Sequence, residues 1–271
     1  MQNDPADPAA SLTFGACVKH IWSSAVQAIA QMPGLMLGAW IVFACLQLLF
    51  GSYRDNAADA AALAASTRIG HAFASLALSA LQLVVYGIVT IKVHRFVLLG
   101  EHTHPLMPDG GKPLARYALT SIAFALTLIA AGLALVPGIR HFGRAGILPA
   151  VLLITCVYFW AAVRVSLLFP SLSTGGRITP RIAWRDSAGH VWSMSWIGFV
   201  AVLPLVVVQL VFYVIVVGVR GLIDPQRNVP VTILSTAFSL AFIVLSAASM
   251  AWLYRRYANG LLAEAAHEAS Q

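Results

Sequence analysis

The sequence predicts an all-α polytopic membrane protein with six transmembrane helices, arranged as three hairpins. Of its 271 residues, 59% are hydrophobic and only 10% are charged, whereas about 25% of the residues of a soluble domain are charged. The mean hydropathy is +0.82, and apolar runs of about twenty residues recur, which is the length that an α-helix needs to cross a bilayer. This composition excludes an ordinary soluble globular protein.

Six apolar runs are long enough to cross about 30 Å of hydrocarbon at about 1.5 Å per residue. The connections between them carry most of the charges, together with prolines and glycines, which favours turns at the membrane surfaces. We assign the membrane domain to residues 32–256. The six predicted spans are residues 33–50, 72–91, 117–136, 145–163, 194–217 and 231–253.

The segment that precedes the first span predicts an amphipathic helix, so residues 1–31 form an N-terminal tail followed by this helix. At about 100° per residue, apolar side chains fill one arc and polar side chains the opposite one. Two placements are open: the helix lies in the cytoplasmic interface of the membrane, or its apolar stripe docks on the helix bundle. The apolar arc contains Phe14, Val18, Ile21, Trp22, Ala25 and Ile29.

The distribution of positive charge predicts that both termini are cytoplasmic. With the N-terminus inside, 11 of the 17 Lys and Arg residues lie in cytoplasmic segments, in agreement with the positive-inside rule. The first apolar run begins only near Pro33 and no cation precedes Lys19, so we expect no cleavable signal peptide. The expected location is the bacterial cytoplasmic (inner) membrane, with residues 257–271 as a C-terminal cytoplasmic tail.

The net charge of +7 and the pI near 9.7 favour an anionic partner. The cations lie between apolar runs, so we expect contact with anionic lipid headgroups and no nucleic-acid partner. A small-xxx-small pair, Gly34 and Gly38, begins the first span. It predicts close helix packing within the bundle, with a homo-oligomer or a membrane protein partner as the alternative.

Residues 163–192 are the most informative stretch for function. Thr179-Pro180 predicts the N-cap and first residue of a short helix. Four arginines in the stretch could converge on one phosphate-bearing face, because guanidinium groups bind phosphate in a bidentate manner. The alternative is that they only set the topology and extend to the membrane surface. The candidate residues for a lipid headgroup or a partner protein are Arg164 at the end of the fourth span, Arg177 before the short helix, and Arg181, Trp184, Arg185 and Trp192 on it.

The same stretch resembles a known family. Its pattern is an Arg164-x-Ser-Leu helix end, a Phe169-Pro170 pair, a glycine turn, Trp184-Arg185 and a Gly-His-Val-Trp run that ends at Trp192. This pattern is similar to the integral membrane domain of some bacterial glycerophosphoryl diester phosphodiesterases and of related, mostly uncharacterised six-helix inner-membrane proteins. In the fused members the phosphodiesterase chemistry belongs to a separate soluble barrel, so the resemblance implies a membrane module and carries over no catalytic residue.

Polar residues inside the predicted spans offer a second, weaker hypothesis. No Asp or Glu lies in the middle of a span, which argues against a proton-coupled pump. Gln82, Pro204 and Gln209 could line an intramembrane pocket in a small permease for an amphipathic or neutral solute, although amides within membranes more often join helices.

No catalytic constellation is evident, so we expect a protein that is not an enzyme, with an intramembrane lipid-modifying enzyme as the weakest alternative. The densest histidine group, His102 and His104, lacks the ligands of an established metal site, and we expect no cofactor. The three cysteines imply no disulfide framework. The leading hypothesis is a non-enzymatic integral membrane module that contacts anionic lipid headgroups or a partner protein through a basic cytoplasmic face.

Overall fold

A computed structural model describes residues 13–59, 65–101, 112–219 and 229–269. These residues form helices and connecting turns without any strand, which confirms the all-α prediction for the described part of the chain. The helices are α1 (Phe14–Gln31), α2 (Pro33–Asp59), α3 (Ala65–Leu99), α4 (Lys112–Val165), α5 (Leu168–Ser173), α6 (Pro180–Asp186), α7 (Val191–Val219), α8 (Val229–Tyr257) and α9 (Asn259–Ala269).

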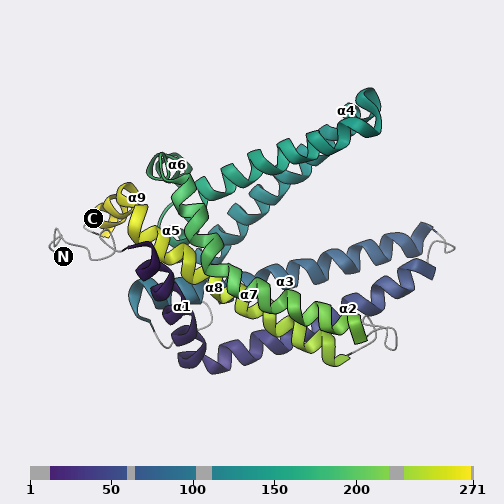
Figure 1. Ribbon diagram of the computed structural model, residues 1–271, viewed down its shortest axis with the longest axis horizontal. Helices are drawn as coiled ribbons and strands as arrows, with labels where there is room; N and C mark the ends of the chain where they lie inside the picture. Colours follow the sequence, from purple (N-terminus) through teal and green to yellow (C-terminus); the bar gives the residue numbers. More distant parts are fainter. Residues whose placement is uncertain (1–12, 60–64, 102–111, 220–228, 270–271) are drawn as a thin grey trace.

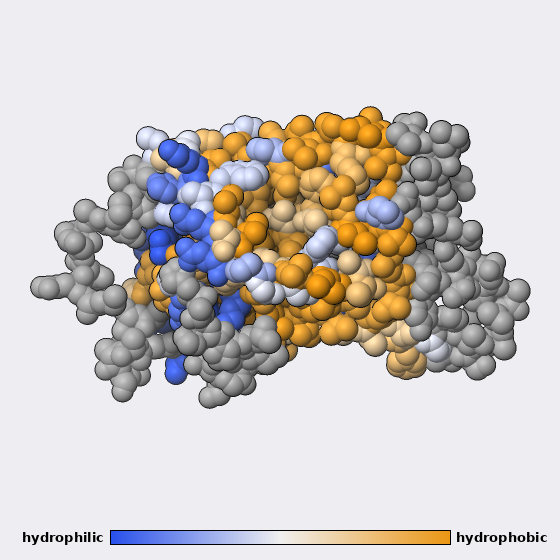
Figure 2. Space-filling model, turned by 90° about the horizontal axis from the view of Figure 1, so that it is seen from below, coloured by the Kyte–Doolittle hydropathy of each residue, from blue (hydrophilic) through white to orange (hydrophobic). Residues whose placement is uncertain are grey.

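Several helices are long and apolar enough to cross a membrane, as a multi-pass protein requires. Four pass this test alone, and the pair α1 and α2, bent by 89° at their junction, counts as a fifth when it is treated as one broken span. The face in Figure 2 carries a broad hydrophobic band with hydrophilic residues gathered at one end. Six spans remain a prediction. The four helices are Phe73–Leu99, Pro113–Ala131, Val191–Val216 and Val229–Tyr257.

Helix α4 contains the third and fourth predicted spans as two antiparallel arms (Figure 1). The rings of Phe124 and Tyr158 lie 4.5 Å apart, and the Tyr158 hydroxyl donates to the Phe124 carbonyl at 3.5 Å. A straight helix would separate these residues by about 50 Å at about 1.5 Å per residue. The chain therefore bends back on itself within α4. The described apolar part of the second arm, Val151–Val165, is shorter than the first.

Helix α8 lies at the centre of the bundle, in contact with α1, α2, α3, α5 and α7. Its buried side includes the small residues Ala247, Ala248 and Ala251. Small side chains let neighbouring backbones approach closely, which is how helices associate in membranes, where the hydrophobic effect between them is weak. The core of the molecule is therefore built around the last predicted span.

Helix α1 exists where the sequence predicts it, with Thr13 as its N-cap. It packs on α7 and α8, and the Trp22 indole donates to the Ala201 carbonyl of α7 at 2.9 Å. The buried face differs from the predicted arc, because Phe14 and Ile29 are 40% and 42% exposed. The described side chains thus favour docking on the bundle over the alternative of a free surface helix. The residues that α1 buries are Cys17, Ile21, Ala25 and Ala28.

The small pair at the start of α2 does not pack within the bundle. Gly34 and Gly38 are exposed, and no neighbouring atom lies within 4 Å of a Cβ built at either position. The prediction of intramolecular packing for this pair is therefore wrong for the described residues. The apolar side chains that reach α3 and α8 come from the other face of α2, which buries Met36, Ala39 and Phe43.

The hydrophilic end of the molecule carries α6, α9 and the start of α1 (Figure 1). The segment predicted as a C-terminal tail contains α9, which packs on α6. The Asp186 carboxylate of α6 accepts a hydrogen bond from the Leu261 amide at 3.0 Å. Leu261 is the third residue of α9, so Asp186 satisfies one of the free N–H groups at the start of that helix.

Candidate functional site

The arginine-rich stretch folds as two short helices between α4 and α7. Helix α6 begins at Pro180, as predicted, and Thr179 occupies the N-cap position, but its side chain makes no capping hydrogen bond. The turn between α5 and α6 contains Gly175 at φ +101°, a left-handed conformation that a residue with a Cβ adopts only with strain. The following Gly176 is also required, because a Cβ there would lie 2.5 Å from the Ser171 hydroxyl oxygen. The two glycines of the turn and the proline at the first position of α6 therefore determine where α6 begins.

The guanidinium group of Arg164 lies in the corner formed by two perpendicular indole rings that contact each other. Its guanidinium carbon lies 4.6 Å from the centre of the Trp160 ring and 4.7 Å from that of Trp184. The two rings are perpendicular, with centroids 5.0 Å apart. Each contact is a cation–π interaction, which strengthens when the cation is removed from water. Trp184 of α6 is thereby fixed against the second arm of α4.

The hydrogen-bonding capacity of Arg164 is incompletely used. Its Nε is buried without a hydrogen-bond partner among the described residues, and its Nη1 reaches the Trp184 carbonyl only at 3.5 Å. No described carboxylate forms an ion pair with it. The Nη atoms of such a guanidinium group retain N–H donors. The oxygens of a phosphate group can accept two of these hydrogen bonds at once.

The other predicted arginines lie around this site rather than in it. Arg181 and Arg185 are one helical turn apart on α6, on one face of the helix, and both are exposed. Neither makes a hydrogen bond or ion pair within the described residues. Arg177 is exposed in the turn before α6. The structure therefore brings Arg164 and Trp184 into contact and places three further cations on the surface nearby in sequence.

Trp192 corrects one part of the sequence prediction. It lies on α7 and not on the short helix, because α6 ends at Asp186 and the chain turns at Gly189, where φ is +81°. Its side chain is 86% exposed, and Trp196, one turn further along α7, is 61% exposed. Exposed tryptophans at one end of a membrane helix are typical of the interfacial layer of the bilayer.

Three other arginines that the sequence predicts on the cytoplasmic side bind backbone carbonyls. Each acceptor lies at or just beyond the end of a helix, where free carbonyls and the negative end of the helix dipole attract cations. These residues therefore join helix ends to one another, a role that their sequence positions did not signal. Arg95 donates to the Ser173 carbonyl at 3.3 Å, Arg116 to those of Gly175 and Gly176 at 2.9 and 3.0 Å, and Arg255 to that of Leu98 at 3.0 Å.

A buried histidine and serine form a pair that resembles a catalytic dyad in distance only. His94 Nδ1 lies 2.8 Å from the Ser173 hydroxyl oxygen, and both side chains are fully buried. The Ser173 hydroxyl also lies 2.8 Å from the Phe169 carbonyl, so its one proton has two acceptors within reach, and because both side chains are fully buried no substrate can approach the hydroxyl. The pair therefore joins α3 to α5 structurally.

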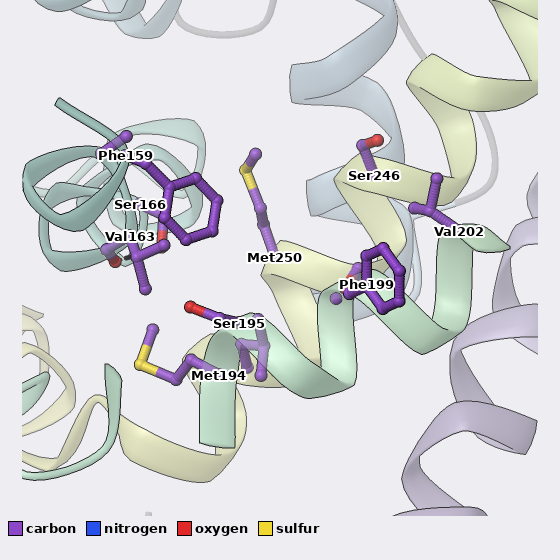
Figure 3. Close-up of a pocket in the computed structure, with 13 residues that line it drawn as sticks. Phe159, Val163, Ser166, Met194, Ser195, Phe199, Val202, Ser246 and Met250 are labelled. Carbon is purple, nitrogen blue, oxygen red and sulfur yellow. Dashed lines mark hydrogen bonds between the residues drawn. The ribbon is translucent and has the colours of Figure 1, made fainter. Parts of the chain in front are cut away.

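An apolar cavity of about 350 Å³ lies between the second arm of α4, α7 and α8. Figure 3 shows Phe159 and Val163 of α4 on one side and Met250 of α8 on the other. Phe159 and Phe199 line the cavity and are 54% and 55% exposed. Because side chains of its wall are also exposed, the cavity opens onto the hydrophobic outer surface of the bundle.

Four serines interrupt the apolar wall of this cavity. Ser166, in the turn that follows α4, donates to the Val163 carbonyl of that helix, and Ser195 donates to the Val191 carbonyl of α7. The Ser249 side chain is 4% exposed, and its hydroxyl oxygen has no hydrogen-bond partner within the described residues. Sequence reasoning missed this cavity, because the only signal was small residues, Gly198 and Ser249, on facing helices that could not be paired in advance.

The polar residues proposed for a permease pocket do not line this cavity. Gln82 lies half-buried on α3 and Gln209 half-buried on α7, and α7 continues as a helix through the exposed Pro204. A solute pocket at these three residues remains a prediction. His102 and His104, the histidines weighed as metal ligands, lie outside the described residues.

No protein-family model matches the sequence, and no curated protein or solved structure was found to match it.

Proposed function

We propose that this protein is a non-enzymatic integral membrane module that binds anionic phospholipid headgroups through its basic end. The observation that carries the proposal is Arg164, whose guanidinium group lies in the corner of the Trp160 and Trp184 rings and makes only one long hydrogen bond, 3.5 Å from Nη1 to the Trp184 carbonyl, within the described residues. The exposed cations Arg181 and Arg185 supply attraction for the same ligand.

The placement in the membrane belongs to the same proposal. The basic end, which carries α6 and α9, faces the cytoplasm, and the membrane is the bacterial inner membrane. In this orientation the exposed Trp192 and Trp196 lie at the headgroup layer. The excess of positive charge in the segments at this end supports that orientation. We also propose that the chain is related to the six-helix membrane domain family that its arginine-rich stretch resembles.

The test compares lipid retention by the full-length protein before and after charge removal. Protein is released from bilayers of phosphatidylglycerol and phosphatidylcholine with identical acyl chains, and retained lipids are counted by native mass spectrometry. The variant replaces Arg164, Arg177, Arg181 and Arg185 with Gln. We expect its preference for the anionic lipid to fall at least about tenfold, because each cation near an anionic leaflet contributes about 1 kcal/mol and about 1.4 kcal/mol is tenfold.

The matched control neutralises four arginines on the side predicted to face away from the cytoplasm. Arg54, Arg68, Arg140 and Arg144 are replaced with Gln, which removes the same number of charges. This control should keep the preference for phosphatidylglycerol. The proposal is wrong if the first variant, inserted in the wild-type orientation, keeps the wild-type preference.

A further inference from the structure

We infer that the lipid headgroup bound at the basic end carries two phosphates, as diphosphatidylglycerol does. Arg164 binds the first phosphate, and the exposed pair Arg181 and Arg185 binds the second. The inference rests on the proposed function, from which it takes the phosphate at Arg164, and it adds the chemical class of the lipid. The contacts of Trp184 and the division of charge between the faces of α6 support it.

Trp184 brings the two groups of cations together. Its indole ring lies 4.7 Å from the guanidinium carbon of Arg164, and its carbonyl accepts the long hydrogen bond from Arg164 Nη1. Arg185 is the next residue in the chain, and Arg181 lies three residues before Trp184 on α6. Cβ atoms at a spacing of three residues are about 5–6 Å apart on a helix. The three arginines therefore lie around one tryptophan.

Helix α6 carries its cations and its acid on different faces. At about 100° per residue, Arg181, Trp184 and Arg185 fall within an arc of about 100°. Asp186 lies on the face that packs on α9, where a Cβ built on Gly260 would be 2.7 Å from its carboxylate. Within the described chain, neither Arg181 nor Arg185 has a hydrogen bond or an ion pair. The arginine face of α6 therefore has no carboxylate of its own helix to balance it.

The number of charges favours a headgroup with two phosphates over a headgroup with one. A single phosphodiester brings one negative charge, which Arg164 alone can match. Like charges one turn apart, as at Arg181 and Arg185, destabilise a helix, and a bound anion relieves this repulsion. A second phosphate supplies that anion, and its oxygens can accept hydrogen bonds from both guanidinium groups. Complementary charge of this kind gives an interface its specificity.

The two groups of cations also lie at the same end of the molecule. Arg164 is in the last turn of α4, and α6 lies next to that end of α4 through the contact between Trp160 and Trp184 (Figure 1). In diphosphatidylglycerol one glycerol joins the two phosphates, which therefore lie side by side in the headgroup layer. The position of α6 beside the end of α4 matches this arrangement.

The first experiment compares three lipids on the wild-type protein. Full-length protein is released from bilayers that contain diphosphatidylglycerol, phosphatidylglycerol and phosphatidic acid at equal amounts of phosphate, and retained lipids are counted by native mass spectrometry. We expect diphosphatidylglycerol to be retained at least about tenfold better per phosphate than phosphatidylglycerol, a factor that one hydrogen bond to a charged group can supply. Phosphatidic acid, which carries its extra charge on one phosphate, should behave like phosphatidylglycerol. Equal retention of all three lipids, or a preference for phosphatidic acid, overturns the inference.

The second experiment removes only the cations assigned to the second phosphate. The double variant Arg181→Gln and Arg185→Gln should lower the ratio of retained diphosphatidylglycerol to phosphatidylglycerol by at least about tenfold, because the contact at Arg164 is common to both lipids. Both positions are exposed, so the fold does not depend on them. The matched control, Arg140→Gln and Arg144→Gln, removes two charges with the same spacing and should keep the ratio. A wild-type ratio in the first variant overturns the inference.

The two proposals fail in different ways. If only the two-phosphate inference is wrong, the variant without the four arginines still loses its preference for phosphatidylglycerol over phosphatidylcholine, and diphosphatidylglycerol has no advantage per phosphate. If the headgroup proposal is wrong, that variant keeps the wild-type preference for phosphatidylglycerol over phosphatidylcholine. This second outcome overturns both proposals, because the second phosphate is assigned relative to the first.

Discussion

Arginines at the hydrophilic end of the bundle form two groups that differ in what their guanidinium groups contact. Arg95, Arg116 and Arg255 donate to carbonyls at helix ends. Arg164 packs against two indole rings, and Arg181 is exposed with no hydrogen bond or ion pair in the described chain. Counting cations cannot separate the groups, because both satisfy the positive-inside rule equally well. The second group makes at most one long contact of this kind, from Arg164 to the Trp184 carbonyl at 3.5 Å, and is therefore the better candidate for a ligand.

Gly260 provides a prediction at the residue scale. A Cβ at this position would lie 2.7 Å from Asp186 Oδ1 and 3.0 Å from Ile182 Cγ2. Gly260→Ala should therefore separate α9 from α6 and remove the hydrogen bond between Asp186 and the Leu261 amide. We expect a loss of about 1–3 kcal/mol of stability, the usual range for overpacking and for a lost helix cap, measured by thermal unfolding in detergent micelles.

Two further variants control this measurement. Gly15→Ala makes the same change in α1, where no atom lies within 4 Å of the new methyl group, and should not destabilise the protein. Asp186→Asn retains a side-chain oxygen that can accept a hydrogen bond from the Leu261 amide. It should therefore reduce the stability of the protein less than Asp186→Ala does. A Gly260→Ala protein as stable as the Gly15→Ala protein would contradict the described contact between α6 and α9.

At the scale of elements, α1 shows how far periodicity predicts a helix and where it stops. The helical spacing of residues 14–29 predicts the helix correctly, and Ile21 and Ala25 are buried as expected. The exact side of contact depends on partners that are far away in the sequence: Trp22 donates to a carbonyl of α7, and Trp252 donates to the Ser24 hydroxyl. Ser24 lies outside the predicted apolar arc, and its partner on α8 explains its place at the contact.

Cys17 reports whether α1 is docked. Its side chain is buried with 0% exposure. In a protein in which Cys45 and Cys156 are replaced by Ala and α1 is otherwise unchanged, a maleimide should therefore label Cys17 slowly. Ile21→Asp introduces an unpaired charge into the same buried face, which is strongly unfavourable, and should increase the labelling rate by at least about tenfold. The rate is measured by mass spectrometry of intact protein in proteoliposomes.

Val26→Asp is the matched control, because Val26 on the same helix is 58% exposed. Its labelling rate at Cys17 should stay close to that of the wild type. Rapid labelling of Cys17 in the protein without either substitution would contradict docking and favour a helix that lies free in the membrane interface.

At the scale of the whole molecule, the polar and apolar regions are segregated. The start of α1, α6 and α9 share one end, and the bend of α4 lies at the other (Figure 1). Figure 2 shows the hydrophobic band between the hydrophilic end and the opposite end of the molecule. The return of the described chain to one end agrees with an even number of crossings, and six crossings remain the prediction.

This arrangement predicts the accessibility of single cysteines to an impermeant maleimide added to intact cells. Ser66→Cys and His141→Cys lie in segments predicted outside and should react. Arg177→Cys and Ser270→Cys lie in segments predicted inside and should react only after the membrane is permeabilised. Labelling is measured by gel shift on a background without native cysteines. Labelling of position 66 but not of 141 in intact cells would mean that the arms of α4 do not cross the membrane.

The sequence predicted the helical class, the positions of most helices and the start of α6, because these depend on local composition and periodicity. It also singled out Arg164 and Trp184, which do meet. It did not predict that Trp160 completes the contact or that Ser249 lies unpartnered in a cavity wall. Trp160 lies one turn before Arg164 on the same helix, so this spacing was present in the sequence and was not used, whereas the place of Ser249 depends on which faces of α4, α7 and α8 come together. In a chain this apolar, nearly every face has the composition of a buried one, so hydropathy does not select the contact.

The central place of α8 has a consequence for biosynthesis. The helices that pack on it, including α1, leave the ribosome before it does, and the hydrogen bond from Trp252 to Ser24 joins residues 228 positions apart. Earlier helices must therefore wait in the bilayer without their main partner until α8 is inserted. Assembly of the bundle is a late event that follows insertion of its parts, and premature termination before α8 leaves the preceding helices with no core to join.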